Sequence, residues 1–271
     1  MIDDSCERLR FEFGKNWKRF LSSLDQRQIV EAEESIKRML PAHELQGKTF
    51  IDVGSGSGLS SLAARRLGAV VSAFDYDPES VACTRSLKDK FFPDDPAWTI
   101  QTGSVLDSEW LRSLGQYDIV YSWGVLHHTG AMWQALQNVD CLVKPGGKLF
   151  ISIYNDQGWL SDFWRVVKRL YNVMPNRLRL VLLLPSLVLI WGPRTLIDLV
   201  RLRPFQTWRT YEKNRGMSPW WDLVDWVGGH PFEVAKPERV LDFYAKRGYR
   251  LQNLNTCGRG LGCNEFVFTK L

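Results

Sequence analysis

A short apolar segment followed by closely spaced glycines most constrains the fold of this chain. Residues 50–58 read Phe-Ile-Asp-Val-Gly-Ser-Gly-Ser-Gly, and residues 59–64 continue as an apolar helix. Gly54, Gly56 and Gly58 have no Cβ atom, which permits a positive φ in a tight turn and lets a ligand lie against the backbone. The pattern predicts a buried strand that turns into a helix beside a bound molecule.

The glycine spacing excludes two common nucleotide-binding motifs. It is G-x-G-x-G, whereas the dinucleotide fingerprint is G-x-G-x-x-G and a phosphate-binding loop ends in Gly-Lys-Ser/Thr. Asp52 precedes the turn, where its carboxylate would repel a phosphate and attract a cation. The expected ligand therefore carries a positive centre. Because such turns also serve as plain tight connections, the motif needs support from the rest of the chain.

Four further apolar segments follow in order, and each ends in a turn. They are residues 70–75, 98–107, 117–124 and 149–154. The first of them closes with Asp75, where a carboxylate at the tip of the neighbouring parallel strand can accept both ribose hydroxyls. Helical segments alternate with these strands, which predicts right-handed crossovers and a parallel sheet.

Together these motifs resemble the class I S-adenosylmethionine (SAM)-dependent methyltransferases, in the small-molecule branch that includes the quinone-type methylases. The resemblance covers roughly residues 48–155 and returns at the C-terminus. It implies an α/β, Rossmann-like fold: a seven-stranded, mostly parallel sheet with helices on both faces and an antiparallel C-terminal edge strand. It also implies SAM as cofactor, S-adenosylhomocysteine as product and no metal.

The resemblance assigns cofactor-binding roles to eight residues. These are Asp52, Gly54, Gly56, Gly58, Asp75, Ser104, Val105 and Trp123. The glycines would cradle the methionine part, Asp52 would favour its cationic end, and Asp75 would take the ribose hydroxyls. Ser104 and Val105 would flank the adenine, although Ser104 stands where many relatives carry an acid. Trp123 would line the same pocket or pack under the end of the sheet.

The ends of the fourth and fifth strands supply the catalytic candidates, because ligands of open α/β sheets lie beyond the carboxyl ends of the strands. A histidine titrates near neutral pH and can remove a proton from a hydroxyl or thiol. His128 is the first candidate and His127 the second, since adjacent helical residues point about 100° apart. The pair can instead cap or pack the helix start. Asp156 would orient the histidine, act as the base, or serve only as a polar loop residue.

Three aromatic or imidazole side chains are candidates for the acceptor pocket. Trp17 shares a helical face with Phe13 and Phe20, and that face either packs on the sheet or closes over the ligands as a lid. Tyr154 follows the fifth strand. His230 lies in an aromatic loop that either closes on the acceptor or forms a plain turn.

A length of 271 residues fits one domain with an insertion. Residues 1–46 form an N-terminal helical lid segment, and residues 47–155 with 237–271 form the SAM-binding core. Residues 156–236 form a helical insertion that serves as a substrate cap or an interface. The insertion holds seven of the twelve tryptophans.

Within this insertion an apolar run covers residues 180–191. Its twelve residues, with a central proline, fall short of the roughly 20 needed to cross a bilayer. Three alternatives stay open: a buried cap helix, peripheral contact of residues 177–209 with a membrane or a lipidic substrate, and a homodimer interface. Nucleic acid is a less favoured partner, because the basic residues alternate with leucines and not with a binding module.

Charge and cysteines place the chain among cytoplasmic proteins. The net charge is +5, and residues 160–211 carry nine Lys and Arg against two Asp. The five cysteines form no C-x-x-C pair and no zinc spacing, which favours buried free thiols in a reducing compartment. The acidic start has no apolar core and is no signal peptide. In the membrane alternative the protein docks at the inner membrane face.

The predicted function is methyl transfer from SAM to an oxygen or sulfur of a small or amphipathic acceptor, such as a quinol precursor. The enzyme would act by in-line displacement, mainly by aligning the acceptor and removing water from it. One alternative is an S-methyltransferase for a small thiol or sulfide, because thiols ionise easily. An alternative of another class is a non-catalytic SAM-binding regulatory module.

Overall fold

A seven-stranded sheet organises the computed structural model, which describes residues 11, 13–215, 218–258 and 260–271. The strand order within these residues is β3-β2-β1-β4-β5-β7-β6. The strands are β1 (Thr49–Val53), β2 (Val70–Asp75), β3 (Trp98–Thr102), β4 (Tyr117–Trp123), β5 (Val143–Tyr154), β6 (Tyr249–Asn255) and β7 (Cys263–Lys270). Strands β1 to β5 pair in parallel, whereas β7 runs antiparallel to both β5 and β6. The predicted fold class is confirmed.

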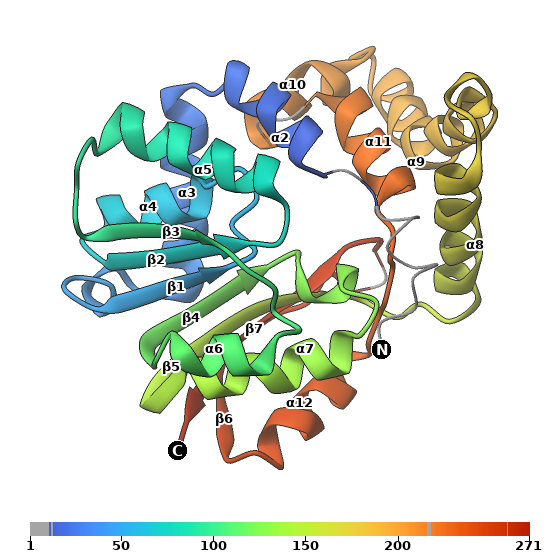
Figure 1. Cartoon of the computed structure of the whole chain (residues 1–271). Coiled ribbons are helices and arrows are strands. Elements are labelled where there is room, and N and C mark those ends of the chain that lie inside the picture. The colour runs from blue at the N-terminus through green and yellow to red at the C-terminus, as the bar shows by residue number, and fades with distance from the viewer. Residues whose placement is uncertain (1–10, 12, 216–217, 259) are drawn as a thin grey trace.

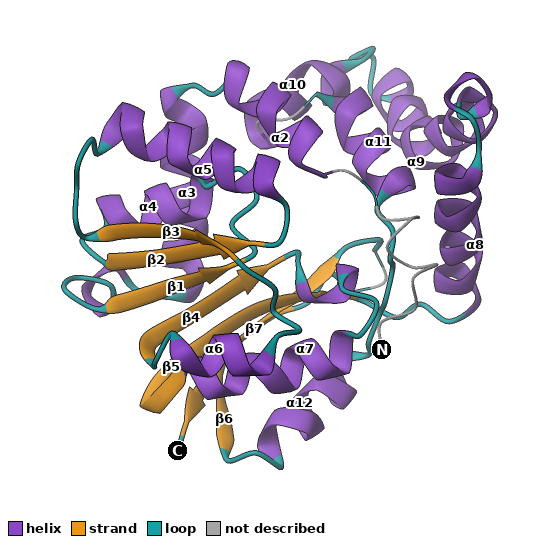
Figure 2. Ribbon diagram, viewed as in Figure 1, coloured by secondary structure: helices purple, strands orange, loops and turns teal. Residues whose placement is uncertain are grey.

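Helices cover both faces of the sheet (Figure 2). Helices α3 (Gln26–Met39), α4 (Leu59–Arg66) and α5 (Pro78–Phe91) cover one face, and α6 (Ser108–Ser113), α7 (Met132–Asn138) and α12 (Pro237–Ala245) cover the other. Two separate apolar clusters result, one on each face. The central strand β1 is therefore buried on both sides, which explains its nearly continuous apolar sequence.

The remaining helices form a layer beyond the carboxyl ends of the parallel strands (Figure 1). They are α2 (Phe13–Ser22), α8 (Trp159–Val173), α9 (Leu180–Val200), α10 (Gln206–Arg215) and α11 (Pro219–Gly228). Trp164, Leu223 and Phe232 belong to a third apolar cluster, which packs α8, α9 and α11 together. The layer combines helix α2 of the predicted N-terminal segment with the insertion, whereas α3 of that segment packs on the sheet. The layer lies where an α/β sheet places its ligand.

Helix α9 corrects the expectation for the apolar run. The helix has 21 residues and continues through both Pro185 and Pro193. With the preceding turn it forms a 25-residue segment, Asn176–Val200, that is long and apolar enough to cross a membrane. Only 17% of the most apolar stretch of this segment is buried within the protein. The apolar run is therefore part of a longer helix that is mostly exposed, and it is not a buried cap helix.

The cysteines follow the prediction only in part. Cys83, Cys141, Cys257 and Cys263 are free thiols, but Cys83 alone among these four is buried. Cys6 lies outside the described residues.

Candidate active site

The glycine turn has the predicted backbone, but two of its glycines serve packing within the protein. Gly54, Gly56 and Gly58 have φ values of 80°, 54° and 81°, a region that favours glycine. A Cβ at Gly54 would lie 2.3 Å from the Val125 side chain, and one at Gly58 would lie 2.7 Å from the Thr84 backbone. The missing Cβ at these two positions thus makes room for protein atoms, while the backbones of Gly54 and Gly56 also line the cavity described below, and contact of the three glycines with a ligand stays a prediction. Gly56 lies against protein as well.

The cover over Gly56 comes from helix α2. A Cβ at Gly56 would lie 3.0 Å from Nε1 of Trp17. The backbone amide of Gly14 in the same helix donates to Asp77 at the start of α5, at 2.9 Å. These contacts place α2 over the glycine turn, in the position expected of a lid.

Asp52 supplies a buried carboxylate at this turn. It is 2% exposed, it lines the cavity described below, and it accepts a hydrogen bond of 2.6 Å from the Ser61 hydroxyl. Burial raises the pKa of Asp52 from 3.8 to about 7, against the opposing hydrogen bond from Ser61. A cation placed beside this group would stabilise the charged form. The site therefore suits a ligand with a positive centre.

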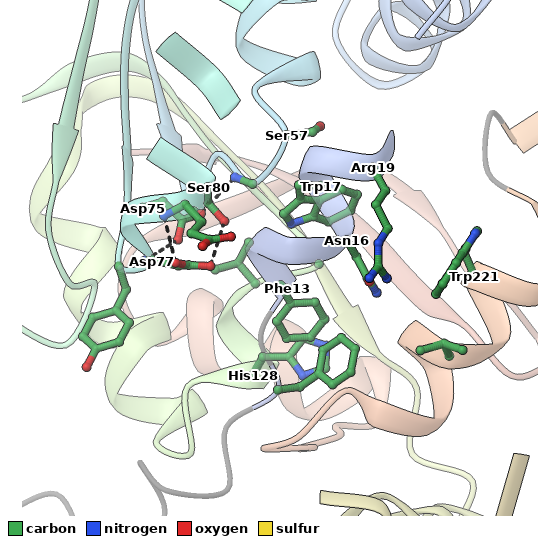
Figure 3. A pocket seen from close by; sticks show the side chains of 18 of the residues that line it. Phe13, Asn16, Trp17, Arg19, Ser57, Asp75, Asp77, Ser80, His128 and Trp221 are labelled. Carbon is green, nitrogen blue, oxygen red and sulfur yellow. Dashed lines mark hydrogen bonds between the residues drawn. The ribbon is translucent and has the colours of Figure 1, made fainter. Parts of the chain in front are cut away.

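Asp75 lies at the end of β2, beside the glycine turn. Its two oxygens accept hydrogen bonds from the backbone amides of Gly56 and Asp77, each at 2.9 Å. Figure 3 shows Asp75 and Asp77 together on one side of the cavity, across from Arg19 and Trp221. These two backbone amides fix the orientation of the carboxylate, whose oxygens each have about two acceptor positions.

A cavity of about 1210 Å³ joins these groups to the upper layer of helices. It is lined by the glycine turn, by the ends of β2 and β4, by α2, and by the insertion, which contributes Tyr171, Arg179, Leu180, Leu183 and Trp220 among others. Pockets for one small ligand usually measure about 300–1,000 Å³. The cavity is therefore large enough for a cofactor and an acceptor together.

Only one of the two adjacent histidines lines the cavity, as expected. His128 lines it, whereas His127 is fully buried behind it. Nδ1 of His128 lies 2.6 Å from the carbonyl oxygen of Pro231. Because a carbonyl only accepts, Nδ1 carries the proton, and the neutral ring has its lone pair on Nε2. The Phe13 ring packs 5.0 Å from the imidazole and helps to hold it.

His127 has a structural environment. Its Nδ1 accepts the backbone amide of Tyr154 at 3.3 Å, and its ring lies 4.0 Å from the Tyr154 ring. Burial, with the neighbouring His128, lowers the pKa of His127 well below its ordinary value. The ring therefore stays neutral and supports the backbone between the fourth and fifth strands.

Asp156, Tyr154 and His230 are not among the described residues that line the cavity. Asp156 accepts the amide of Gly158 at 2.8 Å, which forms the turn into α8. The Tyr154 ring packs 5.4 Å from that of His128 and so supports it from behind. His230 is half-buried, and desolvation lowers its pKa. The structure thus brings Tyr154 close to His128 but gives Asp156 a local role.

Of the three residues predicted to lie near the adenine, only Trp123 is among the described residues that line the cavity. Trp123 lines the cavity and donates from Nε1 to Glu265 at 2.6 Å. Val105 is buried in the sheet core, and the Ser104 hydroxyl accepts the amide of Leu106 at 3.2 Å. Neither of the last two is among the described lining residues. Their contact with adenine stays a prediction.

A buried polar group that the sequence does not predict lies beside helix α2. Asn16 on α2 donates to Asp225 on α11, and Lys168 on α8 donates to the carbonyl of Trp226. Desolvation raises the pKa of Asp225 and lowers that of Lys168, each to about 7. Three separate helices supply these side chains, so no local pattern signals them. Elsewhere, no group of three or more His, Cys, Asp or Glu among the described residues is placed to hold a metal.

Comparison with known proteins places this geometry in a family. The model of the methyltransferase domain family matches residues 24–226, which is more than half of the chain. The chain belongs to this methyltransferase domain family. The match includes the glycine turn, both acidic strand ends and most of the insertion.

Individual relatives within the family match shorter stretches. A ubiquinone biosynthesis O-methyltransferase of Xanthomonas euvesicatoria pv. vesicatoria is 37% identical over 114 residues, covering 41% of this chain and 45% of that protein. One from Xanthomonas axonopodis pv. citri is 35% identical over 128 residues, covering 46% and 49%. The chain thus spans about half the length of the curated relatives it matches.

Solved structures confirm the fold over nearly the whole chain. Magnesium protoporphyrin IX methyltransferase from Synechocystis PCC 6803, crystallised with S-adenosylhomocysteine, covers 95% of this chain and 94% of its own, with a TM-score of 0.57 and 13% identity. An O-methyltransferase family protein from Burkholderia thailandensis covers 88% and 55%, with a TM-score of 0.54 and 12% identity. At such identities the likeness concerns the fold alone.

Proposed function

We propose that this protein transfers a methyl group from SAM to a hydroxyl oxygen of a small, amphipathic acceptor of the phenol or quinol type. The observation that carries the proposal is the single cavity in which Asp52 and Asp75 line one end and His128 another part of the wall. The relatives named as O-methyltransferases support the choice of oxygen.

The residues at the end of the cavity that Asp52 and Asp75 line fit SAM. When bound, SAM supplies a methyl group on a sulfonium, whose leaving group is a neutral thioether. Asp52 offers a buried carboxylate whose charged form a cation would stabilise. Asp75, held by the amides of Gly56 and Asp77, would accept the ribose hydroxyls. Trp17 covers the glycine turn and excludes water from it.

His128 is the proposed general base. The carbonyl of Pro231 fixes its tautomer, so that Nε2 is the atom that accepts the proton of the acceptor hydroxyl. Phe13 on one side and Tyr154 on another hold the ring in place. A positioned base is more useful for a phenol, with a pKa near 10, than for a thiol near 8.5. The oriented histidine therefore favours oxygen over the S-methyltransferase and over a non-catalytic SAM-binding module.

A screen with isotopically labelled SAM tests this proposal against both alternatives. Purified protein is incubated with panels of phenols, quinols and thiols, and S-adenosylhomocysteine is measured. We expect turnover of phenols or quinols that falls sharply in His128→Ala, with His127→Gln as the matched control for disturbance of the local fold. Turnover of thiols alone would refute O-methylation. SAM binding without product over all panels would identify a binding module.

A further inference from the structure

The outer surface of the insertion exposes many large apolar side chains. We call the exposed side chains of α8 and α9 the α8–α9 surface. It includes Trp159, Phe163, Val166, Leu170, Val173, Leu180, Val181, Leu184, Val188, Leu189, Leu196, Leu199 and Val200. Trp159, Val188 and Val200 are 77%, 68% and 77% exposed. Exposed apolar side chains gathered on neighbouring elements mark protein or membrane contacts.

The first part of helix α9, from Leu180 to Pro193, has no charged residue on any side, although one side only is packed on the protein. Leu183, Trp191 and Asp198 are buried on that side, and the Trp191 ring packs 4.6 Å from Trp208. A helix that is apolar all round is normally buried in a protein core or in lipid. Since this helix lies at the edge of the molecule, away from the sheet (Figure 1), the protein core does not cover it.

Arginines flank this apolar surface and indicate what covers it. Residues 177–209 contain six arginines and one acid, Asp198, giving a net charge of +5, which equals that of the whole chain. The acid is buried, where Thr207 donates to it through its amide and its hydroxyl, at 2.7 and 2.8 Å. Arg177, Arg194, Arg201, Arg203 and Arg209 are exposed. The surface thus combines apolar side chains with positive charge, which complements anionic phospholipids.

We infer that the α8–α9 surface docks on an anionic membrane and lies in its interface without crossing it. The uncharged stretch between Arg179 and Arg194 has 14 residues. As a helix it measures about 21 Å, whereas the hydrocarbon core is about 30 Å thick. Trp191 and Asp198 tie the other side of α9 to α10, so crossing would break up the fold. Interfacial docking leaves these contacts intact.

The cavity begins beside this surface. Arg179, Leu180 and Leu183, at the start of α9, line it together with Tyr171 of α8. An acceptor with an apolar tail would therefore reach the site from the lipid side. This last step rests on the proposed function, whereas membrane docking does not depend on it.

Flotation with lipid vesicles tests the docking directly. The full chain is mixed with vesicles of phosphatidylglycerol and phosphatidylcholine, or of phosphatidylcholine alone, and centrifuged through a density gradient. We expect flotation with the anionic vesicles, reduced by salt. Val188→Glu should abolish it, while Val30→Glu, at an exposed valine on α3, should not. Arg201→Ala with Arg203→Ala should weaken partitioning about 30-fold, because each arginine contributes about fivefold.

Two further measurements distinguish docking on a membrane from self-association and from crossing of the membrane. Light scattering gives the mass in solution: a dimer that Val188→Glu converts to a monomer, with no flotation of the wild type, would overturn the inference in favour of self-association. Resistance of membrane-bound protein to alkaline carbonate extraction would show crossing and would equally overturn it. Methylation of a water-soluble acceptor should be unchanged in Val188→Glu. Loss of flotation with intact turnover therefore separates docking from the proposed chemistry.

Discussion

Replacing Asp52 by asparagine should make the unliganded protein more stable while it weakens SAM binding. The carboxylate is buried, and the side chain that bonds to it within the described part of the chain is the Ser61 hydroxyl, at 2.6 Å. An asparagine keeps an oxygen for that hydroxyl and removes the buried charge. The group is therefore retained at a cost in stability, which is typical of a site built for a charged ligand.

The magnitude follows from the pKa of Asp52. Burial raises this pKa from 3.8 to about 7, and a difference of about 3 in pKa corresponds to about 4 kcal/mol. A raised pKa means that the folded state binds the proton more tightly than the unfolded chain does. The stabilisation is thus complete below about pH 4, declines as the pH rises, and is lost above about pH 7. Between pH 5 and pH 8 the decline is about 2–3 kcal/mol.

Urea unfolding at pH 5 and pH 8 measures this effect. Because other groups titrate in the same range, the informative quantity is the free energy of unfolding of Asp52→Asn minus that of the wild type. We expect it to be larger at pH 8 by about 2–3 kcal/mol. Calorimetry should show in parallel that SAM binds the wild type far more tightly than the variant.

Asp118→Asn provides the opposite control. Burial raises the pKa of Asp118, but hydrogen bonds from Thr49 and the pairing with Lys144 outweigh it and hold this pKa at about 2. Its substitution should therefore destabilise the protein more at pH 8 than at pH 3. If Asp52→Asn leaves the free energy of unfolding unchanged, or shifts it equally at both pH values, Asp52 does not have the raised pKa on which this prediction depends.

Three other predictions concern the cofactor and the base. SAM affinity should rise about tenfold from pH 6 to pH 8 in calorimetry, since about a tenth of Asp52 is ionised at pH 6; a flat profile would contradict the role of this carboxylate. Asp75→Ala should weaken SAM binding by about 1–3 kcal/mol, and unchanged affinity would remove the ribose assignment. His128→Ala should lower kcat roughly 10²–10⁴-fold with SAM affinity intact, whereas undiminished turnover would exclude His128 as the base.

Local signals were sufficient for the sheet and for the residues at the strand ends. Asp52 and Asp75 lie in the last residues of β1 and β2, and His128 follows β4. The carboxyl ends of these parallel strands meet at one edge of the sheet. That rule alone placed them around one cavity. The angle between adjacent helical residues predicted that only one of the two histidines faces the cavity, and the structure shows that it is His128.

The features that the sequence did not predict depend on which segments meet in three dimensions. Asn16, Lys168 and Asp225 come from three separate helices, and no sequence period brings them together. The Val125 side chain occupies the space that a Cβ at position 54 would need, and the glycine spacing does not reveal this contact. Helix α9 continues through Pro185, whose usual effect is to break or kink a helix. Its exposure is a tertiary property that an apolar composition alone does not reveal.

A crystal structure with S-adenosylhomocysteine tests the central claim most directly. We expect the nucleoside in the cavity under α2, with the ribose hydroxyls on Asp75 and the cationic amino group of the ligand near Asp52. The sulfur should face His128. A nucleoside bound elsewhere, or ribose hydroxyls that do not contact Asp75, would contradict the account.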